Sequence, residues 1–222
     1  MSYLINNFSL VAQLFGEHLR FTGISLGLAL LLAMPLGLLI ARRRWLQGPI
    51  LGFLGVIYTI PSLSLFVLLI PLFGLGTTPA VIALVAYAQL VLVRNWVVGL
   101  TRIDPAILEA ADGMGMSEWQ RFLRVEFPLA LPLLLAGIRL ATLNIIGIGT
   151  IAAFINAGGL GRLLFEGVIT NHNQKILAGT LAVSALALLA NLFIRLAERY
   201  VEHRLGQEQQ KMKGGTEISL LR

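Results

Sequence analysis

The sequence contains no cysteine and only three lysines among its 222 residues. Without cysteine, this chain has no disulfide and no thiolate metal ligand. The lysines, Lys175, Lys211 and Lys213, do not follow the glycine spacing of a phosphate-binding P-loop, so the usual cradle for ATP phosphates is missing. The three histidines are isolated from one another and from acids at metal-ligand spacing. No serine, histidine and acid set indicates nucleophilic catalysis, and we interpret the chain as non-catalytic.

Acidic residues are missing from long stretches of the chain. None occurs between Glu17 and Asp104, between Glu126 and Glu166, or between Glu166 and Glu198. Carriers of metal ions or protons commonly hold carboxylates inside the membrane, where these groups pair with a desolvated cation or relay a proton. Their absence disfavours both of these transport classes.

What the sequence has in abundance is apolar residues, at 57% hydrophobic against 13% charged. The core of one soluble domain of this size would not bury so many apolar residues, so we interpret the chain as a membrane protein. Residues 21–41 are uncharged and long enough to cross a hydrocarbon core of about 30 Å as a helix. Residues 45–93 carry no charge and fit two spans joined by a turn at residues 71–79, with further spans at 132–154 and 176–194. The predicted fold is an all-α polytopic membrane protein with five transmembrane helices.

The 17 basic residues predict the orientation of these spans, because short cytoplasmic loops collect lysine and arginine. Thirteen are cytoplasmic if the N-terminus lies outside and the C-terminus inside, while only Arg20, Arg162 and Lys175 lie outside. The net charge of +6 then reflects topology, and no aromatic-interleaved basic patch indicates nucleic-acid binding. We expect an external amphipathic segment at 1–20, a transmembrane domain at 21–204 and a flexible cytoplasmic tail at 205–222.

A polar hairpin at residues 104–128 interrupts the apolar segments. Asp104 is a predicted N-cap followed by Pro105 at the first helical position, which starts a helix that Gly113 and Gly115 stop. A second short helix is expected to start at residue 117 with a capping box and to carry Trp119.

This second helix should end before Pro128, because the proline ring disfavours the helical conformation of Phe127. Residues 101–126 contain five acids against three bases on a face that is otherwise basic, so anionic lipid would repel this segment. One alternative is a solvated connector between two spans. The caps, the two glycines and the apolar residues at helical spacing favour a docking element that fits a partner's groove.

Glu109-Ala110-Ala111, then Gly115, then Phe127-Pro128 resembles the EAA loop of bacterial ABC-importer permeases, a family with leucine where this chain has Phe127. Residues 150–161 and 59–63 resemble the branch that imports glycine betaine, choline and carnitine. The resemblance implies a type I ABC importer transmembrane domain in the bacterial cytoplasmic (inner) membrane, with the hairpin as a coupling helix. The residues it assigns to ATPase coupling are Glu109, Ala110, Ala111, Asp112, Gly115 and Trp119.

The resemblance also implies partners. These are two ATPase subunits that carry ATP and Mg, a second permease subunit, an extracytoplasmic substrate-binding protein and membrane lipid, with no cofactor on this chain and no nucleic acid. Five helices enclose little room for a polar solute, so we expect the path between two permease subunits.

Candidate residues for the path or its gate are polar, aromatic or glycine residues within or beside the spans. Tyr58 and Tyr87 offer cation–π contact to a betaine, although both are also compatible with plain packing between helices. Pro61 is expected to kink the second span. Arg139 either meets a substrate carboxylate, reaches the cytoplasmic boundary or pairs with an acid of the hairpin. The full candidate set is Tyr58, Thr59, Pro61, Ser62, Tyr87, Asn144, Thr150, Asn156, Gly158 and Gly159.

The polar members of this set are equally compatible with ordinary interhelical hydrogen bonds. Residues 157–161 suit a re-entrant turn at the external end of the path, or a loop that merely ends the span. Asn156 stands where the resemblance predicts glycine. Two other functions stay open: a methionine or polar amino acid importer with the same hairpin, and a passive channel or membrane scaffold with no ATPase.

Overall fold

The computed structural model describes residues 2–220, and the side chains of all these except residues 2, 5, 202 and 204–220. The described residues are helical, with no strand among them. The α-helices are α1 (Ser2–Asn6), α2 (Phe8–Arg42), α3 (Gln47–Thr59), α4 (Ser62–Phe73), α5 (Thr77–Thr101), α6 (Pro105–Gly113), α7 (Glu118–Arg121), α8 (Phe127–Ile151), α9 (Gly161–Ile169) and α10 (Asn173–Leu220). Short 3-10 turns occupy Arg44–Leu46 and Ala152–Ile155, and a π-turn occupies Phe122–Glu126.

Four of the described helical segments are long and apolar enough to cross a membrane, and a bent helix pair brings the possible number to five. The bent pair is α3 and α4, which meet at an angle of 94°. The bend lies at Ile60 and Pro61, whose extended backbone separates the two helices. The kink expected at Pro61 is therefore a complete break, because proline removes a backbone donor and its ring disfavours helix at the preceding residue. The turn expected at residues 71–79 is present, and Gly74 and Gly76 supply its positive φ angles of 73° and 118°.

The helix that contains the first predicted span is longer than that span. Residues 8–20, part of the external segment expected at 1–20, continue without interruption into the predicted span and form with it the 35-residue helix α2. Nothing between Phe8 and Pro35 lacks a backbone donor, so the helix has no reason to end at the membrane surface. At 1.5 Å per residue, α2 is about 52 Å long, which exceeds the hydrocarbon thickness.

The connection from the hairpin to α8 also differs. We expected the second short helix to end before Pro128 and the next span to start after Pro132, but the chain stays helical from Glu118 to Ile155. Phe127 adopts helical angles, with φ −63° and ψ −47°. The π-turn places one extra residue before Pro128 and shifts the hydrogen-bond register, so the missing proline donor falls in the first turn of α8, where no partner is required.

The last helix, α10, begins at Asn173 and contains the fifth predicted span within its apolar part, residues 173–201. The backbone of α10 stays helical to Leu220, whereas the predicted tail begins at residue 205. The side chains of that segment and all of residues 221–222 lie outside the described part, so the flexible tail stays a prediction.

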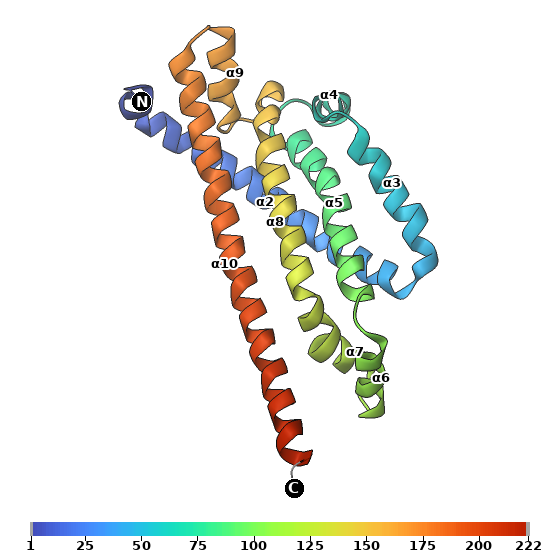
Figure 1. Ribbon diagram of the computed structural model, residues 1–222. Coiled ribbons are helices and arrows are strands. Elements are labelled where there is room, and N and C mark those ends of the chain that lie inside the picture. Colours follow the sequence, from blue (N-terminus) through green and yellow to red (C-terminus); the bar gives the residue numbers. More distant parts are fainter. Residues whose placement is uncertain (1, 221–222) are drawn as a thin grey trace.

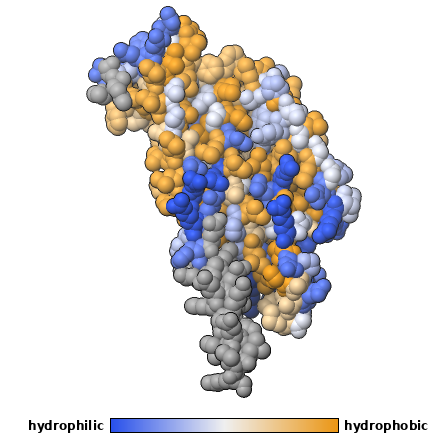
Figure 2. Space-filling view, in the orientation of Figure 1, coloured by the Kyte–Doolittle hydropathy of each residue, from blue (hydrophilic) through white to orange (hydrophobic). Residues whose placement is uncertain are grey.

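Helix α5 lies at the centre of the bundle, between α2 and α8, and α10 packs along the far side of α8 (Figure 1). Fully buried alanines line these contacts, among them Ala29, Ala33, Ala83 and Ala141, and allow the backbones to approach closely. The hairpin and the end of α10 lie at one end of the molecule, and α1, α9 and the α4 bend at the other (Figure 1). Figure 2 shows apolar side chains over most of the visible face between these two ends. We call them the hairpin end and the α9 end.

Candidate functional site

The hairpin forms from local signals that the sequence displays. The carboxylate of Asp104 accepts a hydrogen bond of 2.9 Å from the backbone N–H of Ala106, and Pro105 occupies the first helical position of α6. Ser117 and Gln120 form the predicted capping box, with reciprocal bonds of 3.3 and 2.9 Å. Gly115, at φ 76°, makes the turn between the two helices. Helix, glycine turn and helix are therefore confirmed.

Several large apolar side chains of the hairpin are exposed. Met114 and Trp119 expose 69% and 64% of their surfaces, and Ile107 and Leu123 are also exposed. Trp119 stacks on Phe122 with ring centroids 5.7 Å apart, which holds the indole in place. Exposed apolar residues on two short helices at the end of the molecule are typical of a protein docking surface.

The predicted coupling residues divide between this surface and the interior of the hairpin. Glu109 and Ala110 are exposed, as are Asp112 and Gly115, whereas Ala111 is buried against the rest of the hairpin.

A chain of ion pairs joins the hairpin to the transmembrane bundle. Asp112 of α6 accepts from Arg121 Nη1 at 2.6 Å, and Arg121 Nε donates to Glu126 at 2.9 Å. Arg42, the last residue of α2, donates through Nη2 to both oxygens of Glu126, at 2.9 and 3.1 Å. Glu126 is only 4% exposed and serves both arginines. We call these four residues the charge chain.

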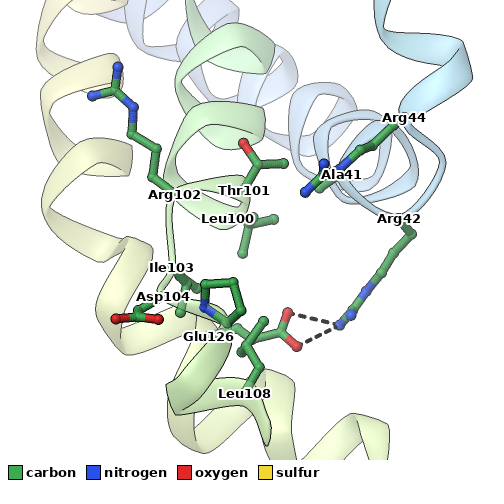
Figure 3. Close-up of a pocket in the computed structure, with 11 residues that line it drawn as sticks. Ala41, Arg42, Arg44, Leu100, Thr101, Arg102, Ile103, Asp104, Leu108 and Glu126 are labelled. Carbon is green, nitrogen blue, oxygen red and sulfur yellow. Dashed lines mark hydrogen bonds and ion pairs between the residues drawn. The ribbon is translucent and has the colours of Figure 1, made fainter.

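A polar cavity of about 340 Å³ lies beside the charge chain, where the end of α2 faces the connection between α5 and α6 (Figure 3). Figure 3 shows Arg42 and Glu126 bonded at its lower side, with Arg44 above Arg42 and Asp104 on the opposite side. The cavity leaves space between the hairpin and the helix ends. The charge chain bridges this space and joins the hairpin to α2, beside apolar packing of Leu38 and Ala41 in the cluster that holds Phe122.

The glycine turn, residues 156–161, lies near the α9 end of the molecule. Asn156 has the left-handed angles φ 62° and ψ 29°, and Gly158 and Gly159 follow with φ 80° and 74°. The departure from glycine at Asn156 is thereby explained, since asparagine tolerates this conformation better than other side chains.

The glycine turn packs tightly on the outer half of α2. The backbone N–H of Gly159 donates to Glu17 Oε2 at 3.1 Å. A Cβ atom on Gly159 would lie 2.8 Å from the Phe21 ring and 2.9 Å from His18 Nδ1. His18 is fully buried, and its Nε2 lies 3.2 Å from the carbonyl oxygen of Ile146 in α8. This position therefore requires glycine both for its backbone angles and for space.

Beside the glycine turn, ion pairs close the loop between α9 and α10. Glu166 is paired with Lys175 and with Arg162. The hydrogen bond from Lys175, followed by that from Arg162, holds the pKa of the Glu166 carboxyl below its usual range.

The bend between α3 and α4 brings three of the candidate path residues together. Tyr58 and Tyr87 meet edge to face with ring centroids 5.9 Å apart, and Asn144 Nδ2 lies 3.4 Å from the Tyr58 hydroxyl. The Tyr87 hydroxyl donates to the carbonyl oxygen of Ile60, a group left unpaired by the helix break. Tyr87 is buried and Tyr58 is exposed, so only one ring of the pair offers its surface.

The remaining candidates do not join this group through side-chain bonds. Thr59 donates to Val56 and Thr150 to Gly147, each within its own helix turn. Both bonds stay within one helix, so they are not the interhelical hydrogen bonds that were the alternative to a path-lining role. Among the described residues, no three histidine or acidic side chains come together at metal-ligand distance.

Arg139 has a partner that the sequence interpretation did not name. Its Nε lies 3.2 Å from Glu198 Oε1 of α10, and both side chains are largely buried. Neither a substrate carboxylate nor an acid of the hairpin is needed to pair this charge. The ion pair joins α8 to α10.

Sequence reasoning also missed Glu17, His18, Arg42 and Glu126 as contact residues. The sequence places Glu17 and His18 in the external segment expected at 1–20, and Arg42 is one of the thirteen basic residues that orient the spans. The one available signal was the position of charged residues directly at the ends of apolar runs. It gives no partner, because their long-range partners lie 84, 128 and 142 residues away along the chain.

Comparison with known proteins matches residues 33–207 to the family described as binding-protein-dependent transport system inner membrane component. The osmoprotectant import permease protein OsmW of Salmonella typhimurium is 42% identical over 192 residues, which cover 84% of this chain and 89% of OsmW. The glycine betaine/carnitine/choline transport system permease protein OpuCB of Bacillus subtilis is 36% identical over 201 residues, with coverages of 90% and 93%.

Among solved structures, an inward-facing conformation of the MetNI methionine ABC transporter superposes with a TM-score of 0.80 at 21% identity. The superposition covers 87% of this chain and 97% of that one. At this identity the likeness shows the fold. The helical bundle is thus the transmembrane fold of an ABC importer permease, and the chain belongs to the family of binding-protein-dependent transport system inner membrane components.

Proposed function

We propose that this chain is the permease subunit of an ATP-driven importer for a small zwitterionic or quaternary-ammonium osmoprotectant. The relatives named for osmoprotectant, glycine betaine, carnitine and choline transport cover most of its length at 36–42% identity, and they support this solute class. ATP and Mg are held by two partner ATPase subunits, since this chain has no P-loop.

The observation that carries the ATPase assignment is the apolar, exposed face of the hairpin. Met114 and Trp119 present apolar surface at the end of the molecule, and the adjacent Glu109 adds charge. A groove on a soluble subunit would cover this face and remove it from water. Closure of two ATPase subunits would then displace the hairpin and bias the bundle between inward- and outward-facing arrangements.

The solute path lies between this chain and a second permease subunit, identical or related. Tyr58 exposes an aromatic ring at the break between α3 and α4, and the amide of Asn144 lies beside it. A quaternary ammonium group can meet the face of such a ring without a counter-charge, which suits spans in which acids are scarce. The glycine turn lies near the opposite end of the bundle from the hairpin and serves as the gate there.

The orientation follows from the basic residues, with the hairpin cytoplasmic and the α9 end outside. A substrate-binding protein delivers the solute to the α9 end. The chain lies in the bacterial inner membrane, as its family description indicates.

The experiment that tests the ATPase partner uses two neighbouring glycines. A methyl group on Gly113 meets open space in a helix, whereas Gly115 has φ 76° and resists any side chain. We expect Gly115→Ala and Glu109→Lys to lose co-purifying ATPase or its stimulation by the liganded binding protein. Gly113→Ala should retain both. Wild-type stimulation in Gly115→Ala and Glu109→Lys would contradict the assignment.

The same preparation separates the alternatives. A methionine importer shares the fold, so the solute is decided by a binding screen on the partner binding protein with betaines, choline, carnitine and methionine. A passive channel or scaffold would show no ATPase in the purified complex and would conduct solute without nucleotide.

A further inference from the structure

Helix α2 is held at both of its ends by polar contacts to parts of the chain that the proposed function requires to move. At the hairpin end, Arg42 donates two hydrogen bonds to the buried carboxylate of Glu126. Through the charge chain, this contact reaches Arg121 and then Asp112 of α6. The end of α2 is therefore fixed to the hairpin rather than to solvent.

At the other end, α2 contacts the glycine turn. Glu17 accepts the N–H of Gly159, and His18 and Phe21 leave no room for a side chain there. His18 also contacts the carbonyl of Ile146, while its Nδ1 has no hydrogen-bond partner among the described residues. A movement of α2 on one side, or of α8 on the other, would therefore displace the glycine turn.

Between these ends, α2 packs closely on α5 on both sides of Pro35. A Cβ atom on Gly37 would lie 2.5 Å from Trp96 Cβ, and the buried Ala29 and Ala33 bring the two backbones close. Gln89 of α5 donates to the Ala29 carbonyl at 3.1 Å. Closely packed helices move together because their interface resists deformation. Glu17 and Arg42 are 25 positions apart, which corresponds to about 37 Å along the helix.

We propose that α2 is a rigid strut linking the hairpin to the glycine turn, with Arg42 and Glu17 as the positioning residues at its two ends. This inference rests on the proposed function, since it assumes that an ATPase displaces the hairpin. Displacement of α6 pulls on Arg121 and Glu126, Glu126 shifts Arg42 with α2, and Glu17 moves the backbone of Gly159.

The absence of cysteine allows a direct test. A single reporter cysteine replaces Phe154, an exposed residue just before the glycine turn, and carries an environment-sensitive fluorophore. The signal is compared in the complete complex without nucleotide and with ATP trapped by vanadate. We expect the background protein to show a nucleotide-dependent change, and Arg42→Ala and Glu17→Gln each to reduce it at least five-fold.

Matched controls separate this effect from lost charge or stability. Arg43→Ala removes the neighbouring exposed arginine and should retain the full change, as should Arg20→Gln near the outer end of α2. Arg42→Lys, which keeps a donor for Glu126, should restore most of the change. Because the two contacts act in series, the double variant of Arg42→Ala and Glu17→Gln should lose no more than the worse single one.

The outcomes distinguish the two proposals. A full nucleotide-dependent change in Arg42→Ala, with ATPase bound, overturns the strut and leaves the importer assignment standing. Equal losses in Arg43→Ala and Arg42→Ala likewise overturn it. If the background protein binds no ATPase, the proposed function fails and the strut fails with it.

Discussion

Replacement of Gly159 by alanine gives the sharpest test of the glycine turn as a gate. The added Cβ would lie 2.8 Å from Phe21 Cε1, 2.9 Å from His18 Nδ1 and 3.2 Å from the His18 Cα atom. The last of these is backbone, which cannot rotate away. Left-handed angles cost a non-glycine residue about 1–2 kcal/mol, and overpacking of a filled site costs about 1–3 kcal/mol. Together these give about 2–5 kcal/mol of local destabilisation.

The assay combines uptake of radiolabelled glycine betaine, thermal unfolding of the purified complex and the amount of ATPase retained. Gly159→Ala should abolish or strongly reduce uptake while ATPase still co-purifies, because the hairpin lies at the other end of the bundle (Figure 1). Gly147→Ala is the matched control, since its Cβ meets open space within α8. Its effect on stability should stay within about 1 kcal/mol, in the stabilising direction.

A second variant tests the cause. Phe21→Leu in the Gly159→Ala background removes the nearest contact and should recover part of the lost stability, although the strained φ remains. Equal uptake and unfolding temperature for Gly159→Ala and Gly147→Ala would refute the reasoning.

Three further predictions follow from other contacts. Asn156→Gly should match wild type in unfolding temperature, whereas Asn156→Val should lose about 1–2 kcal/mol of stability, because a β-branched residue resists the left-handed angles. Equal stability of the two variants would contradict the left-handed conformation at residue 156. Tyr87→Phe removes the hydrogen bond to the Ile60 carbonyl and should cost about 1 kcal/mol in chemical unfolding, with faster proteolysis at the helix break; an unchanged proteolysis rate would contradict this. Glu166, whose pKa is lowered by Lys175, should stabilise the loop between α9 and α10 fully above its unfolded pKa of about 4.3 and lose this contribution as pH falls through the lower folded pKa. Amide hydrogen exchange over residues 161–175 between pH 7 and 3 should show the loss in wild type and not in Glu166→Gln.

Features that depend on neighbours in the chain were predictable. The caps at Asp104 and Ser117 are bonds to residues two and three positions away, and the sequence displays both partners. Apolar run lengths likewise predicted the long helices, since a membrane fixes how many uncharged residues a helix needs. The turn at Gly115 followed from the same local information.

Predictions of where a helix ends, made from single prolines or charges, were less successful. Pro128 predicted the end of a helix, yet the π-turn before it absorbs the missing donor and keeps the chain helical into α8. Helix α2 likewise extends beyond the predicted span, because charge at Glu17 and Arg20 marks a change of environment and does not interrupt the backbone bonds of the helix.

The sequence by itself determined an all-helical membrane protein with a capped polar hairpin and a glycine-rich turn, because composition, caps and backbone preferences act over a few residues. Only the tertiary structure decided which charges meet: Arg139 with Glu198, Arg42 with Glu126, and Glu17 with the backbone of Gly159. These partners are far apart in the chain, and a carboxylate stabilises an arginine or an N–H only when packing of the helices brings the two within about 3 Å.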